Sequence, residues 1–114
     1  FGVWMRNQRI RLYGVDAPES RTSDTEEKRF GLLSKDFLTR WTSSGHLTIK
    51  TFKDSKGKYG RILGEIWYYG EHNINQLLID HHLAVAYHGQ SKDEIAQEHL
   101  DNREKVDLFE IYKD

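Results

Sequence analysis

Cysteine is absent from this chain of 114 residues, which excludes a disulfide framework and any thiolate metal site. Proline occurs once, and no apolar run is long enough to span a membrane. A large excess of either charge is also absent. The formal net charge of −1 argues against a protein that coats nucleic acid over its whole surface. Any metal site must therefore use oxygen or nitrogen ligands, and the cell compartment stays open.

Charged residues are plentiful but unevenly distributed along the sequence. Residues 1–61 hold 13 Lys and Arg against 7 Asp and Glu, whereas residues 62–114 hold 4 against 11. Local cations attract phosphates even on a nearly neutral protein, so the first half could guide a polynucleotide to a site. The alternative is that these charges only keep loops solvated. The candidate basic face consists of Arg6, Arg9, Arg11, Lys53, Lys56, Lys58 and Arg61.

The length and the apolar content of 37% predict one hydrophobic core and a single domain over residues 1–114. Apolar periodicity and turn residues predict strands at 8–14, 46–52, 61–68 and 83–87 and helices at 25–42, 74–82 and 92–105. Ser91 and Glu94 have the spacing of a capping box at the start of the last helix. Strands interleaved with three short helices fit a small five-stranded β-barrel of the oligonucleotide/oligosaccharide-binding (OB) type, with the helices packed outside.

The most informative stretch is 11–19, Arg-Leu-Tyr-Gly-Val-Asp-Ala-Pro-Glu. Alternate residues of a strand share a face, so Arg11 projects away from the apolar residues that flank it. The strand ends before Pro18, whose fixed φ holds Asp16 and Glu19 in a turn. One cation and two carboxylates so arranged could hold a phosphate and a hard metal ion. The alternative is an ordinary polar turn with a solvated arginine.

A second polar segment, residues 54–61, contains glycines and leads into the apolar run 62–68. It places Arg61 at the entrance of another strand. Hydrolysis of a phosphodiester needs a metal to polarise the phosphoryl oxygen, a carboxylate to orient or deprotonate water, and guanidinium groups on the equatorial oxygens. The two segments together therefore favour this chemistry over two unrelated turns.

Four segments in this order resemble the staphylococcal-nuclease-like (thermonuclease) family. They are residues 11–19, Lys-Tyr-Gly-Arg at 58–61, Asn-Gln-Leu-Leu-Ile-Asp-His-His-Leu-Ala-Val-Ala-Tyr at 75–87, and a helix containing Glu98-His99-Leu100. The resemblance covers nearly all of residues 5 to 105. It implies an OB-fold with a five-stranded barrel and three helices, and a calcium-dependent nuclease acting on DNA or RNA.

The resemblance also implies a metal site in the first segment. Asp16 would bind Ca²⁺ through its carboxylate, and Ala17 would bind it through its backbone carbonyl, so alanine in place of the family's usual threonine need not abolish that contact. Glu19 would act as the general base or would position the attacking water.

The same resemblance implies the groups that bind the substrate. Arg11 and Arg61 would hold the phosphate and stabilise the pentacoordinate transition state. Lys58, Tyr59 and Tyr87 would line the nucleotide pocket, the lysine on a terminal phosphate and the tyrosines against a base or a phosphate.

The sequence departs from the family at its start. The family begins with a strand and an Asp-Gly-Asp-Thr-type turn that supplies the other metal carboxylate, and this sequence opens at Phe1-Gly2-Val3-Trp4 without them. We therefore expect a domain that lacks the family's first strand, binds metal poorly and cleaves slowly, because a hard cation prefers six to eight oxygen ligands. The open sheet edge would favour a domain-swapped or edge-paired dimer.

The histidines and the aromatic residues of the C-terminal tail are expected to have structural roles. The six histidines match no zinc spacing, so surface or capping positions are expected for His46, His72, His81, His82, His88 and His99. In the tail, Phe109 or Tyr112 is expected to replace the tryptophan with which the family docks its last helix on the barrel.

Two classes of function remain. The first is a calcium-dependent phosphodiesterase centred on Arg11, Asp16, Glu19 and Arg61. The second is a non-catalytic OB-fold module that binds nucleic acid or a protein partner, as degenerate members of the superfamily do. Degenerate copies usually lose the glutamate or an arginine, and this sequence retains all four residues. Retention favours the nuclease, because function follows the site rather than the fold.

Overall fold

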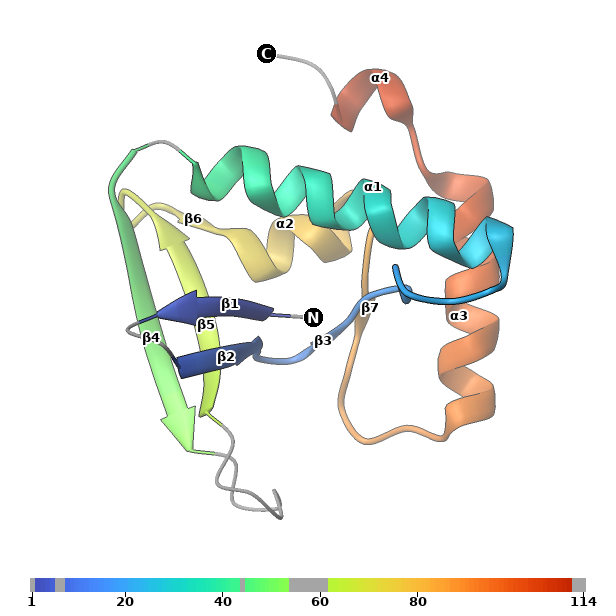
Figure 1. Cartoon of the computed structure of the whole chain (residues 1–114), viewed down its shortest axis with the longest axis horizontal. Coiled ribbons are helices and arrows are strands. Elements are labelled where there is room, and N and C mark those ends of the chain that lie inside the picture. The colour runs from blue at the N-terminus through green and yellow to red at the C-terminus, as the bar shows by residue number, and fades with distance from the viewer. Residues whose placement is uncertain (1, 6–7, 44, 54–61, 112–114) are drawn as a thin grey trace.

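The structure is a computed structural model that describes the backbone of residues 2–5, 8–43, 45–53 and 62–111, with side chains from residue 10 onward (Figure 1). Three residues with expected roles, Lys58, Tyr59 and Arg61, lie outside these ranges. None of the described helices combines the length and the apolar character that crossing a membrane requires.

The larger sheet is mixed, with strand order β1-β2-β5-β4. Strand β2 (Gln8–Leu12) pairs with β1 (Gly2–Met5) in the antiparallel sense and with β5 (Ile62–Tyr68) in the parallel sense. Strand β4 (Leu47–Lys53) runs antiparallel to β5, which also pairs with the short β6 (His72–Asn73). Since β5 is central, it holds both halves of the sheet together.

A second sheet of two strands stands beside the first. It consists of β3 (Val15–Asp16) and β7 (Val85–Ala86), paired in the antiparallel sense. The backbone N–H of Tyr87 donates to the carbonyl of Gly14 at 2.8 Å, which extends this pairing into the turn after β2. Gly14 has φ of +74°, a value that favours glycine at this turn. The small sheet thus places Asp16 next to the chain that follows α2.

The described residues form four helices, α1 (Thr25–Thr42), α2 (Ile74–Asp80), α3 (Lys92–Lys105) and α4 (Leu108–Ile111). Figure 1 shows α1 extending from the β4 side of the molecule to α3, while β3 and β7 run between the large sheet and α3. The side chain of Ser91 accepts a hydrogen bond from the Glu94 N–H at 3.2 Å, which confirms Ser91 as the N-cap of α3.

The core lies between the large sheet, α1 and α2. Leu12 and Ile66 from the sheet pack against Phe37 and Leu38 of α1 and against Leu78 of α2. Each of these side chains is exposed by 5% or less. Trp41 of the same helix α1 packs against this core. The core therefore fixes β2, and with it the start of the segment that carries the candidate site.

The segment after β3 packs directly on α1. A Cβ atom added at Gly31 would lie 2.5 Å from the carbonyl oxygen of Glu19 and 2.7 Å from the backbone nitrogen of Ser20. Such distances fall inside van der Waals contact, so only glycine lets α1 approach the backbone here. This close approach fixes the main chain at Glu19.

The expectation of a closed five-stranded barrel is not met by the described strands. Strands β1 and β4 are the two edges of the larger sheet, and no described ladder joins them. The seven residues of β4 pair along their whole length with β5, and β1 has only four residues. The expectations of a missing first strand and of an edge-paired dimer stay predictions.

Four short elements were not predicted from the sequence: β1, β3, β6 and the helix α4. The anchoring role expected in the tail is also wrong for Phe109, whose side chain is 78% exposed. Ile111, at 5% exposure, joins the core instead, and its carbonyl accepts a hydrogen bond from Arg40 Nη1 at 3.3 Å. The single turn of α4 rotates Ile111 inward and Phe109 outward. Tyr112 lies outside the described residues.

Candidate active site

A cleft of about 1060 Å³ opens beside the small sheet. One wall is the segment that runs from the end of β2 through β3 to Glu19, and the opposite wall is formed by the loop 87–90 and the first part of α3. Polar side chains on both walls face the same space, notably those of Arg11, Asp16, Glu19, Tyr87, Lys92 and His99. The cleft is therefore the place where the candidate residues of distant segments meet.

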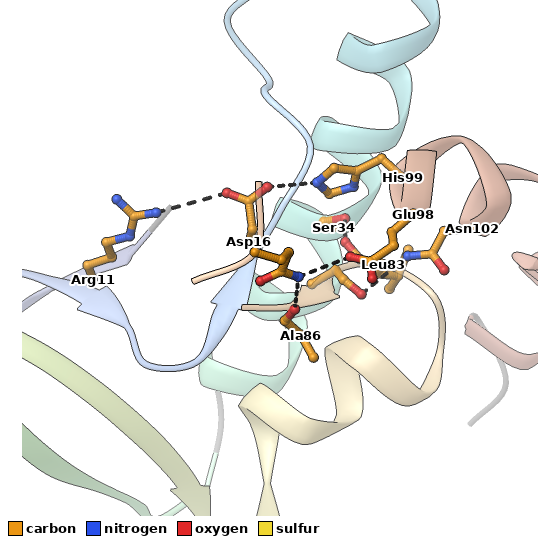
Figure 2. A network of polar contacts seen from close by, with 10 residues as sticks. Arg11, Asp16, Ser34, Leu83, Ala86, Glu98, His99 and Asn102 are labelled. Carbon is orange, nitrogen blue, oxygen red and sulfur yellow. Dashed lines mark hydrogen bonds and ion pairs between the residues drawn. The ribbon is translucent and has the colours of Figure 1, made fainter. Parts of the chain in front are cut away.

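Asp16 is the central carboxylate of this cleft (Figure 2). Its Oδ1 lies 3.9 Å from Nη2 of Arg11, and its Oδ2 lies 2.7 Å from Nε2 of His99. The side chains of Arg11, Asp16 and His99 are 40%, 30% and 16% exposed. Because a carboxylate accepts hydrogen bonds, Nε2 carries the proton in the contact with His99. Two cationic or hydrogen-bonding groups from different elements thus orient one carboxylate.

Arg11 is positioned by the alternation of β2. Its neighbours Ile10 and Leu12 are each 2% exposed and anchor the strand in the core, which directs Arg11 to the opposite face. A guanidinium group offers five N–H donors, so an ion pair at 3.9 Å leaves donors for a further anion. The strand therefore presents a cation that is oriented but not saturated.

The turn between β2 and β3 is fixed from inside the molecule by Asn75. This side chain is 4% exposed and donates from Nδ2 to the carbonyls of Tyr13 at 2.9 Å and Gly64 at 3.0 Å. Its Oδ1 accepts the N–H of Ile66 at 3.2 Å. One buried amide therefore ties α2 to β5 and to the turn that leads into Asp16.

A separate network docks α3 against the chain before it (Figure 2). Gln90 donates from Nε2 to the carbonyl of Ala86 at 2.7 Å and to Glu98 Oε2 at 3.0 Å. Asn102 donates to the carbonyl of Ala84 at 3.3 Å. These contacts come from residues on either side of His99 and determine how far its ring reaches toward Asp16.

Glu19 and Ala17 occupy different environments within the same segment. The side chain of Glu19 is exposed at the cleft, whereas Ala17 is 9% exposed and belongs to the core cluster. Burial of the alanine side chain anchors the segment and leaves the carboxylate of Glu19 in solvent. Of the eight residues with expected roles, the five that the structure describes, namely Arg11, Asp16, Ala17, Glu19 and Tyr87, all line this cleft.

The donor atoms fit calcium in kind but not in number. Carboxylate and carbonyl oxygens are the ligands of a hard cation, which takes six to eight of them. Within the described ranges there is no group of three or more His, Cys, Asp or Glu side chains placed to hold an ion. Asp16 and Ala17 thus supply part of a calcium site, and further ligands would come from water or from groups beyond the described residues.

His99 is the residue of the site that the sequence analysis missed. All six histidines were expected at surface or capping positions, and His81 does cap α2. His99 instead faces inward and contacts a carboxylate 83 residues earlier in the chain. Its place in a helix that resembles the nuclease family was the available signal, but helical periodicity alone could not reveal the partner.

The larger, mixed sheet is flanked by helices, and one arginine and two carboxylates line a single cleft. The chain belongs to the staphylococcal nuclease family, since the family model described as "Staphylococcal nuclease homologue" matches residues 9–106. This confirms the resemblance found in the sequence, and the family implies the OB-fold.

Curated relatives with nuclease names are similar over most of the chain. It is 33% identical over 85 residues to Endonuclease YhcR of Bacillus subtilis (strain 168), covering 69% of this chain and 7% of that protein. It is 31% identical over 81 residues to Thermonuclease of Staphylococcus hyicus, covering 71% and 47%. An "Uncharacterized endonuclease" of Escherichia coli is 29% identical over 87 residues, covering 76% and 52%. The chain spans about half the length of the last two and a small part of the first.

Proposed function

We propose that this domain is a nuclease that hydrolyses phosphodiester bonds of DNA or RNA. The observation that carries the proposal is the meeting of Arg11, Asp16 and Glu19 in one cleft. The nuclease names of its relatives support the same reaction. A cation and two carboxylates at one cleft are among the groups that phosphodiester hydrolysis uses, together with a metal ion.

Each residue has a distinct role in the proposed reaction. Arg11, and Arg61 from the other segment, bind the non-bridging oxygens of the scissile phosphate and stabilise the charge that develops there. Glu19 positions or deprotonates the attacking water, for which its exposed carboxylate is accessible. Tyr87, Lys58 and Tyr59 contact the nucleotide. Exposure of Tyr87 by 48% at the cleft agrees with this role.

We propose calcium as the cofactor, held by the Asp16 carboxylate and the Ala17 carbonyl. The bound ion would supply a positive charge that polarises a phosphoryl oxygen. Because Asp16 already contacts Arg11 and His99 and the described ligands are few, we expect this chain by itself to bind calcium weakly and to cleave slowly.

The test is cleavage of end-labelled single-stranded DNA and RNA by the purified chain, in calcium and in excess chelator. Calcium binding is measured separately by isothermal titration calorimetry on the wild type and on Asp16→Asn. We expect slow cleavage that requires calcium and weak calcium binding that Asp16→Asn abolishes. Equal cleavage in calcium and in chelator would disprove the metal assignment.

One observation favours a second candidate, a module that binds nucleic acid without cleaving it. Each oxygen of the Asp16 carboxylate already has a protein partner, Oδ1 the guanidinium of Arg11 and Oδ2 the imidazole of His99. This candidate predicts oligonucleotide binding at every calcium concentration with no cleavage at any of them. Cleavage that disappears in Glu19→Gln would exclude it.

A further inference from the structure

We propose that Tyr13, supported by Phe52, is a stacking platform for a nucleobase of the substrate. The inference rests on the proposed function in taking nucleic acid as the ligand, and it adds a residue to which neither the family match nor the relatives assign a role. It predicts that the cleft recognises unpaired bases as well as phosphates, because a stacked base must leave its duplex.

The first observation is the geometry of the two rings. The centroids of Tyr13 and Phe52 lie 4.6 Å apart with an interplanar angle of 31°, so one side of the Tyr13 ring rests on Phe52. The Tyr13 side chain is nevertheless 44% exposed. A partly exposed aromatic ring that is backed by a second ring has the features of a stacking surface.

The second observation is the charge beside the rings. Nζ of Lys50 lies 5.5 Å from the centroid of Phe52, and Lys50 is exposed on β4. Arg11 precedes Tyr13 by two residues and lines the cleft with it. A strand advances about 3.3 Å per residue, so the two Cα atoms are roughly 7 Å apart. Cations near partly exposed aromatic rings are the usual combination at sites for single-stranded nucleic acid.

The third observation is that the backbone at Tyr13 is rigid. Its N–H donates to the carbonyl of Gly64 at 2.8 Å, and its own carbonyl accepts from Asn75 at 2.9 Å. The carbonyl of the next residue, Gly14, accepts a hydrogen bond from the N–H of Tyr87, the tyrosine proposed above to contact the nucleotide. A platform on fixed backbone loses little conformational entropy when a base stacks on it.

The competing explanation is that Tyr13 merely shields Phe52 from solvent. Tyr69 provides a matched comparison, since it is 58% exposed and its ring lies 4.7 Å from that of Tyr68. Among the described residues Tyr69 is not part of the cleft lining, whereas Tyr13 is. A shielding role predicts equal consequences at the two tyrosines, and a stacking role predicts an effect on ligand binding at Tyr13 alone.

The experiment measures fluorescence anisotropy at low salt in excess chelator, which separates binding from cleavage. The probes are a labelled short thymidine oligonucleotide and its abasic analogue of the same length. Wild type should bind the thymidine strand more tightly. Tyr13→Ala should weaken that binding by about 5- to 150-fold and leave the abasic analogue nearly unchanged, because base stacking on an aromatic ring contributes about 1–3 kcal/mol.

Four further variants sharpen the result. Tyr13→Phe should keep the preference for bases, and Tyr13→Leu, which still covers Phe52, should lose most of it. Tyr69→Ala should bind both probes like the wild type. Folding of each variant is checked by thermal melting. Arg11→Ala should weaken both probes to a similar extent.

The proposal is overturned if folded Tyr13→Ala or Tyr13→Leu keeps the preference, if Tyr69→Ala loses it equally, or if wild type binds neither probe. These outcomes are distinct from failure of the nuclease proposal. If the wild type discriminates bases through Tyr13 but never cleaves, the stacking site is supported and the nuclease proposal is wrong. If the wild type cleaves and Tyr13→Ala binds like the wild type, the nuclease proposal stands and the stacking proposal is wrong.

Discussion

Nε2 of His99 on α3 lies 2.7 Å from Oδ2 of Asp16 on β3, and this contact joins two elements 83 residues apart in the sequence. The same carboxylate lies 3.9 Å from the guanidinium of Arg11 on β2. The position of the central carboxylate therefore depends on how α3 docks as well as on its own strand. Substitutions that shift α3 should therefore displace the Asp16 carboxylate, even where the substituted residue does not contact the substrate.

Replacing His99 with alanine should lower the free energy of unfolding by about 1 kcal/mol, or roughly 4 °C in melting temperature. The loss is moderate because Asp16 is 30% exposed and water can replace the imidazole. Thermal denaturation followed by circular dichroism measures it. The matched control is His88→Ala, which removes an exposed histidine from the same cleft and should leave stability unchanged. Equal melting temperatures for the two variants would contradict a stabilising contact.

Asn75→Ala should be the more damaging change, at about 3 kcal/mol or above. It removes three hydrogen bonds from a side chain that is 4% exposed and leaves the carbonyls of Tyr13 and Gly64 without that donor. Urea denaturation gives the difference. The control Gln76→Ala, one residue along α2 and exposed, should fall within about 0.5 kcal/mol of wild type. A loss below 1 kcal/mol at Asn75 would show that the amide does not fix the turn.

The longer elements of this fold follow from local pattern. The helix predicted at 25–42 coincides with α1, and the strands at 46–52 and 61–68 differ from β4 and β5 by one residue at their ends. In each case apolar periodicity, a capping residue or a glycine turn is present in the segment itself. The four elements that were missed have between two and four residues, so their pairing partners or tertiary packing, rather than their own sequence, determine them.

Some residues of the candidate site could also be predicted from local pattern, and others could not. Arg11, Asp16 and Glu19 could be found from one segment, because strand alternation and Pro18 fix their directions locally. The roles of Asn75 and His99 depend on partners 62 and 83 residues earlier in the sequence. The periodicity of a single helix gives no information about such distant partners. Gly31 shows the same limit, since a glycine inside a helical pattern gives no sign that Glu19 packs against it.

Gly31→Ala should destabilise the protein by about 1–3 kcal/mol, although the same change in an exposed helix normally stabilises by about 1 kcal/mol. The sign reverses because the new methyl group would lie 2.5 Å from the carbonyl oxygen of Glu19. Nuclease activity should fall as well, since the Glu19 segment must move. Chemical denaturation and a cleavage assay test both points. Leu32→Ala, at an exposed position of α1, is the control expected to change neither. A more stable Gly31→Ala would refute the close packing.

Arg11→Lys should reduce turnover on the order of 10²-fold while the domain remains folded. Lysine keeps the positive charge but not the planar pair of donors that matches two phosphate oxygens. Initial rates on single-stranded DNA at saturating substrate measure the effect. Arg40→Lys, which keeps a positive charge and an N–H donor beside the carbonyl of Ile111 and lies outside the cleft lining, serves as the control and should keep full turnover. Full activity of Arg11→Lys would remove Arg11 from the transition state and reduce it to a general electrostatic role.

Glu19→Gln isolates the proposed chemical step. The amide has nearly the same shape as the carboxylate, but it cannot accept a proton from water and it orients the water less strongly. The value of kcat should therefore fall by about 10²- to 10⁴-fold. Affinity for an oligonucleotide in chelator should change little, because Glu19 is expected to contact the water rather than the base. The side chain is exposed, so stability should also be preserved, and a melting curve checks this. If kcat is unchanged and only the affinity for the oligonucleotide changes, Glu19 binds substrate and another group must activate the water.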